Sequence, residues 1–150
     1  MGDGVRPEPA DAEASLRHLL DIASSGEWYA RIDLADTEKL PPEVYRALVD
    51  DEAAEVIVLL ARNHSTPREV LDELASRGTQ LSEVVDLNPN ASPMNKERVP
   101  IWKHTQVSLE RYFEELALTP AVRSEILDAW MAHSPATLGT LRRAAEQNLT

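Results

Sequence analysis

A repeat with a period of about 25 residues, in the middle of the chain, most constrains how this sequence can fold. An apolar stripe, an asparagine and a proline recur in the same order. The repeated residues are Val56, Leu59, Leu60, Asn63 and Pro67, then Leu81, Val84, Val85, Asn88 and, one residue late, Pro93. A repeat of this length is typical of units that bury their apolar faces only against their neighbours.

Regularly spaced prolines indicate where the helices of these units begin. They are Pro41, Pro67, Pro93 and Pro120, and the residues before the last three are Thr66, Ser92 and Thr119. Proline suits the first residue of a helix because its missing N–H has no partner there and its φ is already helical. The preceding hydroxyl can accept from a backbone N–H two or three residues on. Thr66 with Glu69 forms a capping-box pattern.

Each proline is followed by residues that would lie on one helix face. The third, fourth and seventh positions are Val44, Tyr45 and Leu48 after Pro41, and Val70, Leu71 and Leu74 after Pro67. This spacing is helical. We expect the second helix of each unit to end at Asn63 or Asn88 in the left-handed region, which asparagine tolerates. No segment alternates with period two, so we expect no strand.

The flanking segments depart from the repeat. Residues 1–10 combine glycine, proline and charge, and we expect them to be disordered. Asp11 is a candidate N-cap for a helix that would shield the end of the array. After Pro93 the stripe positions hold Lys96 and Glu97, and Pro100 interrupts any helix. Helical spacing then resumes over about 105–148, with starts expected near Ser108, at Pro120 and at Ser134-Pro135.

Two segments, Ala61–Leu71 and Asn88–Pro93, resemble the leucine-rich repeat variant family. The shared pattern is an Asn-Pro-type turn, a Thr-Pro, a Glu-Val-Leu and a second Leu-Ala, which Leu74-Ala75 supplies. The resemblance covers about residues 30–93 and implies a short right-handed α-solenoid in which α-helices alternate with shorter 3₁₀ helices. We therefore expect an all-α chain with an N-terminal capping helix, two or three repeats and a C-terminal helical region, forming one domain over 11–150.

Composition and charge limit the cellular compartment and the classes of binding partner that we expect for the chain. The net charge is −11, and residues 1–62 hold 6 basic and 14 acidic groups, a net of −8. Such a field repels nucleic acid and anionic membranes and favours a basic protein partner. The absence of cysteine excludes disulfides, thiolate nucleophiles and iron–sulfur clusters. No basic start with an apolar run opens the chain, and no apolar run approaches the roughly 20 residues that span a bilayer, so we expect a cytoplasmic protein without membrane contact.

No pattern in the sequence points to catalysis, a metal or a cofactor. The four histidines lack the i, i+4 spacing of a helical zinc site. The acidic run at Asp50–Glu52 lacks the spacing of a calcium loop and suits the N-terminus of the following helix. There is no glycine-rich phosphate loop and no serine in a nucleophile elbow. We expect no enzyme activity, no metal and no cofactor.

Two groups of residues are candidates for partner contact. The first lies at exposed positions of the repeat helices: Glu43, Arg46 and Ala47, then Arg68, Asp72 and Glu73. The second is a locally basic, aromatic stretch over 95–104, with Lys96, Arg98, Trp102, Lys103 and His104. Tryptophan and arginine are favoured anchors of interfaces. The alternative, which we favour, is that Trp102 and Ile101 fill the junction between the repeats and the C-terminal helices.

These observations favour a protein–protein interaction module, because stacked helix pairs present a continuous surface. One alternative is an acidic inhibitor or nucleic-acid mimic that binds a basic protein. A second is a nucleic-acid binder that uses the C-terminal helices, whose Ser134–Leu138 region loosely resembles the start of a recognition helix. Arg142 and Arg143 would then contact phosphate. The acidic balance of the chain makes nucleic acid the less favoured partner.

Overall fold

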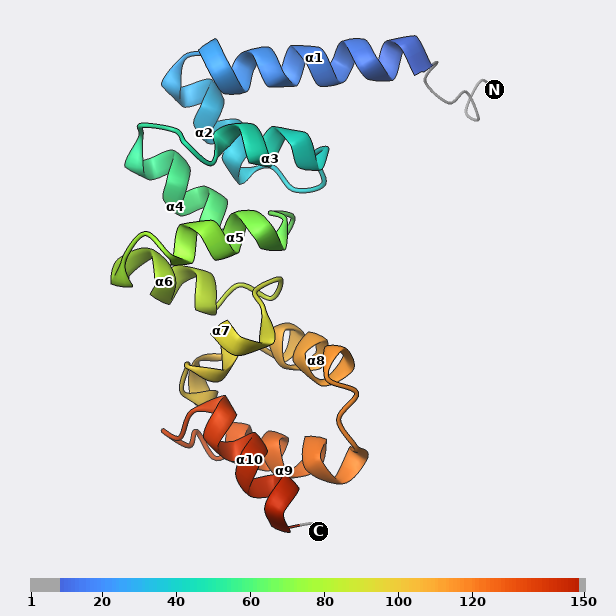
Figure 1. Ribbon diagram of the computed structural model, residues 1–150, viewed down its shortest axis with the longest axis vertical. Helices are drawn as coiled ribbons and strands as arrows, with labels where there is room; N and C mark the ends of the chain where they lie inside the picture. Colours follow the sequence, from blue (N-terminus) through green and yellow to red (C-terminus); the bar gives the residue numbers. More distant parts are fainter. Residues whose placement is uncertain (1–8, 149–150) are drawn as a thin grey trace. The chain divides into compact units, whose positions relative to one another are not determined.

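The computed structural model describes residues 9–148, which form helices joined by short turns and contain no strand (Figure 1). The first helices are α1 (Pro9–Ser25), α2 (Trp28–Asp36), α3 (Pro42–Leu48) and α4 (Ala54–Arg62). They are followed by α5 (Arg68–Ala75), α6 (Thr79–Asp86), α7 (Pro93–Glu97), the 3₁₀ helix η1 (Ile101–Lys103), α8 (Gln106–Glu115), α9 (Pro120–Met131) and α10 (Leu138–Asn148). The all-α prediction is confirmed. The expected alternation with shorter 3₁₀ helices is wrong for residues 30–93, where α2 to α7 are all α-helices and η1 lies outside that range. No helix in this described part combines the length and apolar character needed to cross a bilayer.

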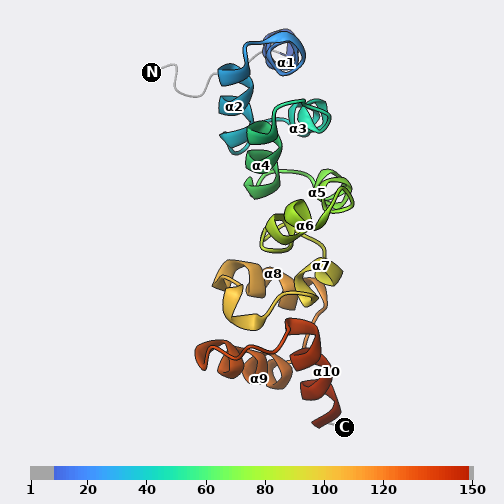
Figure 2. The same ribbon diagram turned by 90° about the vertical axis from the view of Figure 1, so that its left-hand side faces the viewer.

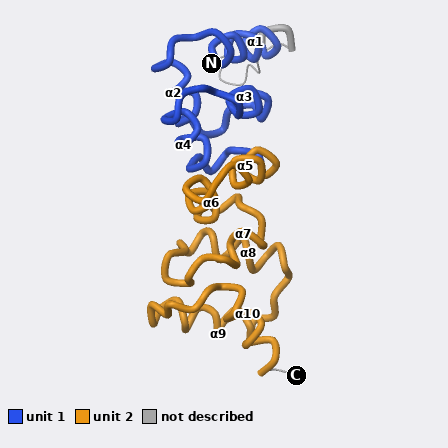
Figure 3. Tube along the Cα trace, turned by 60° about the vertical axis from the view of Figure 1, so that its left-hand side comes forward, with its two compact units in different colours: residues 1–67 blue, residues 68–150 orange. Residues whose placement is uncertain are grey.

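The helices form two compact units, Met1–Pro67 and Arg68–Thr150 (Figure 3). Unit 1 holds α1 to α4, and unit 2 holds α5 to α10. The sequence predicted one domain over 11–150, and the boundary between the units falls inside the segment predicted to contain the repeats.

In unit 1 the helices form two layers. Helix α1 packs on α3 and α2 packs on α4, while consecutive helices also touch (Figure 2). The predicted stripe of α3 is fully buried at Val44, Tyr45 and Leu48, and α4, which touches α3, is fully buried at Val56 and Leu60. The helical spacing seen in the sequence therefore identifies the core of this unit correctly.

An asparagine closes the second helix of each pair through the same turn. The Asn63 side-chain oxygen accepts from the Ser65 N–H at 2.9 Å, and the Asn88 oxygen accepts from the Asn90 N–H at 2.8 Å. The Asn63 amide also donates to the carbonyls of Ala35 (2.8 Å) and Thr37 (2.9 Å). The prediction of a left-handed asparagine is wrong for both residues: the φ of Asn63 is −69°, and Asn88 is not among the described residues with a positive φ. The asparagine side chain, and not an unusual backbone, satisfies each turn.

In unit 2 the helices pack around a second core. Helix α5 packs on α6, α7 touches α6, α8 and α10, and α9 packs on α10 and η1. The core residues are Ile101, Leu109, Tyr112, Phe113, Leu118, Val122, Ile126, Leu138 and Ala145. The predicted caps are confirmed at Ser92, which accepts from the Asn95 N–H, and at Thr119, which accepts from the Val122 N–H.

The break after the third proline is also confirmed, because α7 ends at Glu97 and η1 follows Pro100. The start of the last helix is wrong: α10 begins at Leu138 and not at Ser134-Pro135. The backbone there is engaged elsewhere, since the Ile101 N–H donates to the Ala136 carbonyl and the Leu138 N–H donates to the Val99 carbonyl.

The predicted starts of three other helices are each displaced. Helix α1 begins at Pro9 and not after an Asp11 cap, while α3 and α5 begin one residue after Pro41 and Pro67. Of the segment 1–10 predicted to be disordered, residues 1–8 lie outside the described part of the chain.

Candidate functional site

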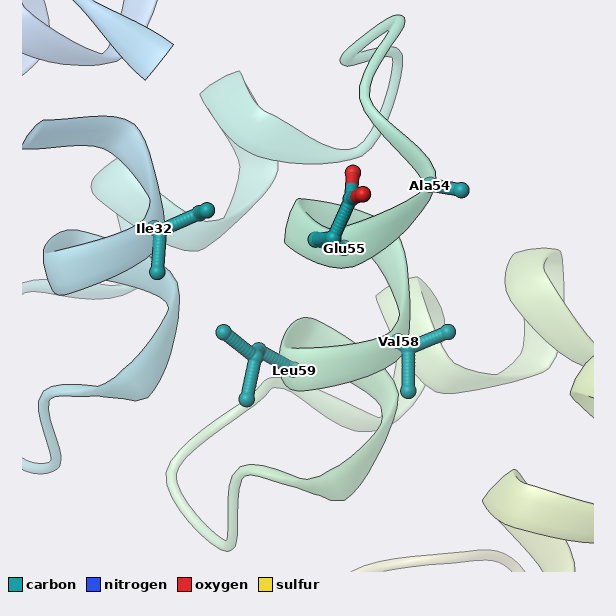
Figure 4. A pocket seen from close by; sticks show the side chains of 5 residues that line it. All are labelled: Ile32, Ala54, Glu55, Val58 and Leu59. Carbon is teal, nitrogen blue, oxygen red and sulfur yellow. The ribbon is translucent and has the colours of Figure 1, made fainter. Parts of the chain in front are cut away.

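A shallow apolar groove lies between α2 and α4 of unit 1 (Figure 4). Its volume is about 530 Å³, and it is lined by Ile32 of α2 and by Ala54, Glu55, Val58 and Leu59 of α4. In the close view Ile32 faces Glu55 and Leu59 across the space between the two helices. We call this feature the α2–α4 groove.

The composition of α4 explains why the groove exists. A surface helix needs one apolar stripe toward the core, and α4 supplies it with Val56, Ile57, Leu60 and Ala61, all buried. Val58 and Leu59 lie outside that stripe and are only partly buried. Residues 56–60 are five consecutive aliphatic residues, of which only three are buried in the core. The other two, Val58 and Leu59, line the groove.

Two aromatic side chains extend this apolar surface along α2. Trp28 is 57% exposed and Tyr29 is 60% exposed, with their rings edge-on at 6.4 Å between centroids. Residues three and four apart on a helix are neighbours on its surface. Tyr29 and Trp28 therefore share the helix face of Ile32, and apolar surface continues from the groove to the start of α2.

Acidic groups surround this surface. Asp33 and Asp36 are exposed on α2, and Glu55 lies in the groove itself. Arg31, the basic residue of α2, is already paired, because its Nε lies 2.8 Å from the Asp51 carboxylate and its Nη1 donates to the Gly26 carbonyl. The basic residue of α4, Arg62, is in its last turn. Unit 1 as a whole holds 6 basic and 14 acidic residues.

A second, polar hollow of about 350 Å³ lies beside α1, α2 and α3 and contains the Arg31–Asp51 ion pair. Asp50 and Glu52 also line it. Across the described ranges, no cluster of three or more histidine or carboxylate side chains is arranged to hold a metal ion.

None of the contact residues predicted on the repeat helices lines the groove. Arg46 is exposed on α3 together with Glu43 and Ala47, while Asp72 and Glu73 are exposed on α5. The Glu73 carboxylate pairs with Arg77 at 3.0 Å.

Arg68, predicted to contact a partner, has a role inside unit 2. Its guanidinium donates to the carbonyls of Asn90 (3.2 Å) and Ala91 (3.3 Å) and pairs with Glu115. The side chain therefore ties the start of α5 to the turn between α6 and α7.

Two predicted contact residues of the 95–104 stretch are buried. Lys96 is 0% exposed, and its Nζ donates to the carbonyls of Pro89 (2.6 Å) and Ser108 (3.0 Å). His104 is 4% exposed, and its Nε2 lies 2.9 Å from the Lys96 carbonyl oxygen. Burial lowers the pKa of Lys96 to about 8 and the pKa of His104 to about 4. The prediction that these two residues bind a partner is corrected, because the fold encloses both.

The other three predicted contact residues of that stretch, Arg98, Trp102 and Lys103, are exposed. Trp102 is 49% exposed, and the Lys103 ammonium lies 5.5 Å from the centre of its ring. Arg98 pairs with Asp86 at 2.9 Å. Ile101 is fully buried, in the core formed with α8, α9 and α10, whereas the packed-junction interpretation is wrong for Trp102. The chain places the aliphatic residue, and not the indole, in the core.

Arg142, the candidate phosphate contact of α10, belongs to a partly buried network of hydrogen bonds and ion pairs. Its Nε donates to Glu97 at 2.8 Å, its Nη1 donates to Glu146 at 3.1 Å, and the Tyr112 hydroxyl donates to the same Glu97 oxygen at 2.7 Å. Burial and the Glu97 carboxylate raise the pKa of Tyr112, so its hydroxyl remains a donor. This network joins α7, α8 and α10 and occupies Arg142, whereas Arg143 is exposed.

Comparison of the chain with protein-family models, with curated proteins and with solved structures finds no match. The candidate site therefore rests on the geometry described above. Sequence reasoning did not identify the α2–α4 groove. Two signals for it were present: the unbroken aliphatic run 56–60, and the adjacent aromatic pair Trp28 and Tyr29 in a chain with few aromatic residues.

Proposed function

We propose that this chain is a protein–protein interaction module that binds its partner at the α2–α4 groove. The observation that carries the proposal is an exposed apolar surface of Trp28, Tyr29, Ile32 and Leu59 on an otherwise strongly charged unit. Contiguous apolar surface of this kind is a feature of binding sites. Tryptophan and tyrosine are also enriched among the residues that dominate binding energies.

The two-layer packing of unit 1 supports this function. Helices α2 and α4 lie side by side in one layer, so their outward faces form a continuous surface to which both contribute. The recurrence of the asparagine turn supports the further proposal of a short repeat array of the leucine-rich-variant kind. Such an array would work as an adaptor without catalytic chemistry.

Site-directed crosslinking tests the function. A photo-crosslinking amino acid at Tyr29 is expected to capture a partner in cells of the native host, and the same group at Ala47 on α3 serves as the control. With the captured partner purified, Trp28→Ala and Leu59→Glu should each weaken its affinity by about tenfold or more.

Charge reversal at Asp72 and Glu73 separates this groove from the contact surface that the sequence suggested. The double variant is expected to bind the partner normally, because neither residue lines the groove. Loss of binding there with unchanged binding by Trp28→Ala would move the interface away from the groove and contradict the proposal.

A further inference from the structure

The α2–α4 groove has one charged residue among its lining, and that residue restricts what can bind. Ile32, Val58 and Leu59 offer apolar contact, while Glu55 places a carboxylate beside them. A carboxylate covered by an uncharged partner group loses water without compensation. A favourable occupant therefore brings a cation next to its apolar side chain.

We propose that the occupant is a basic amphipathic helix of a partner protein, with an apolar side chain in the groove and a lysine or arginine one helical turn away on Glu55. This inference rests on the proposed function and deepens it. Glu55 is then the residue that determines specificity.

The size of the groove sets how much of the partner enters it. A volume of about 530 Å³ accommodates a few large side chains and is too small to enclose a whole helix. The partner therefore lies across α2 and α4 and inserts anchors spaced three or four residues apart, as in other helix-in-groove complexes. Trp28 and Tyr29 extend the apolar contact beyond the groove along α2.

The backbone of α2 and α4 favours a helical over an extended occupant. An extended peptide gains affinity mainly by pairing its backbone with an exposed sheet edge. The described residues contain no strand, and the interior N–H and C=O groups of α2 and α4 are satisfied within the helices. Affinity at this surface must come from side chains, and a helix presents several of them on one face.

The acidic surroundings of the groove favour a partner surface of positive charge. Asp33, Asp36 and Glu55 are the acidic groups of the two groove helices, and Arg31 is already paired with Asp51. A partner helix with lysine or arginine beside its apolar stripe complements this field, whereas an acidic helix meets repulsion.

Binding of two synthetic peptides to the full chain tests the inference. Each peptide has about 16 residues, alanine-rich to favour a helix, with leucines on one face. One peptide carries lysines beside that face, and its twin carries glutamates at the same positions. Fluorescence anisotropy of the labelled peptides is expected to show about tenfold tighter binding of the lysine peptide, weakening as salt rises from about 50 to about 500 mM. Methyl NMR shifts should localise binding to Ile32, Val58 and Leu59.

Substitution of Glu55 then separates a specific pair from diffuse attraction. Glu55→Lys is expected to reverse the preference, so that the glutamate peptide binds more tightly than the lysine peptide. Glu43→Lys makes the same charge change at an exposed position of α3 and is the matched control, for which the preference should persist. Equal effects of the two variants would show diffuse electrostatics and overturn the proposal. Methyl shifts confined to other residues would do the same.

The outcomes also separate this inference from the function beneath it. If the native partner crosslinks at Tyr29 but its affinity is unaffected by Glu55→Lys, the groove binds a partner of different chemistry and only the inference fails. If Leu59→Glu leaves that affinity unchanged, the proposed function fails. Concentration-dependent self-association that Leu59→Glu abolishes would identify a second copy of the chain as the occupant and overturn the basic-helix assignment.

Discussion

The buried His104 predicts a specific loss of stability in mild acid. Its Nε2 forms a hydrogen bond with the Lys96 carbonyl oxygen, and its Nδ1 has no hydrogen-bond partner among the described residues. The neutral ring therefore fits the site with Nε2 as donor. Protonation at Nδ1 would place a second N–H, and a charge, where no acceptor lies and where the Lys96 ammonium is close.

The size of the effect follows from the difference in pKa between the two states. Burial lowers the pKa of His104 from 6.5 to about 4 in the folded chain. Between these values the unfolded state binds the proton and the folded state does not, so stability falls as pH decreases through this window. Each pKa unit corresponds to about 1.4 kcal/mol, and this histidine thus removes about 3 kcal/mol between pH 7 and pH 4.

Urea unfolding at pH 7 and pH 4.5 measures this loss, with His104→Gln as the comparison. Glutamine keeps an N–H donor for the Lys96 carbonyl but does not titrate. The parent should lose about 2 to 3 kcal/mol more than the variant over this interval, since other titrating groups affect both chains alike. A histidine NMR titration provides a direct check. A His104 midpoint at or above 6 in the folded chain, or equal losses of stability in parent and variant, would contradict this prediction.

Three further substitutions have expected effects on the free energy of unfolding, each measured by chemical denaturation. Thr66→Ala should lower it by about 1 kcal/mol, because the buried Thr66 hydroxyl donates to the Leu60 carbonyl. An unchanged free energy would show that this hydrogen bond does not stabilise the fold. Gly139→Ala should lower it by about 1 to 2 kcal/mol, although alanine has the better helix propensity, because an added Cβ would lie 3.0 Å from the Glu97 Cβ. A gain in stability would show that α7 can shift to make room for the methyl group. Asn63→Ala should lower it by about 2 kcal/mol, because the Ala35 carbonyl loses the Asn63 donor and the Thr37 carbonyl keeps only the Tyr45 hydroxyl. Asn63→Asp also lacks the N–H donor and should not restore the stability.

The sequence predicted the features that depend on residues close together in the chain. The spacing of Val44 and Leu48 identifies a buried helix face, and the position of Thr119 before Pro120 identifies a cap. Both follow from helix geometry alone. The exact start of α10 did not follow, because it depends on hydrogen bonds to residues 99–101, which are distant in sequence.

The candidate site was beyond sequence reasoning for a related reason. Whether Leu59 lies in the core or in a groove depends on which face of α4 the neighbouring helices cover, and periodicity alone does not decide this in an unbroken aliphatic run. Lys96 was predicted to contact a partner and is instead buried. Lysine is almost never fully buried, and its burial here requires carbonyls of Pro89 and Ser108 that converge only in the folded chain.

The enclosure of Lys96 has a practical consequence for chemical modification. The chain has three lysines, and Lys39 and Lys103 are exposed. Amine-reactive dyes or surface-coupling reagents should therefore attach to the native protein at the side chains of Lys39 and Lys103 and spare Lys96. Because neither reactive lysine lines the α2–α4 groove, amine coupling immobilises the protein with its candidate binding surface unmodified.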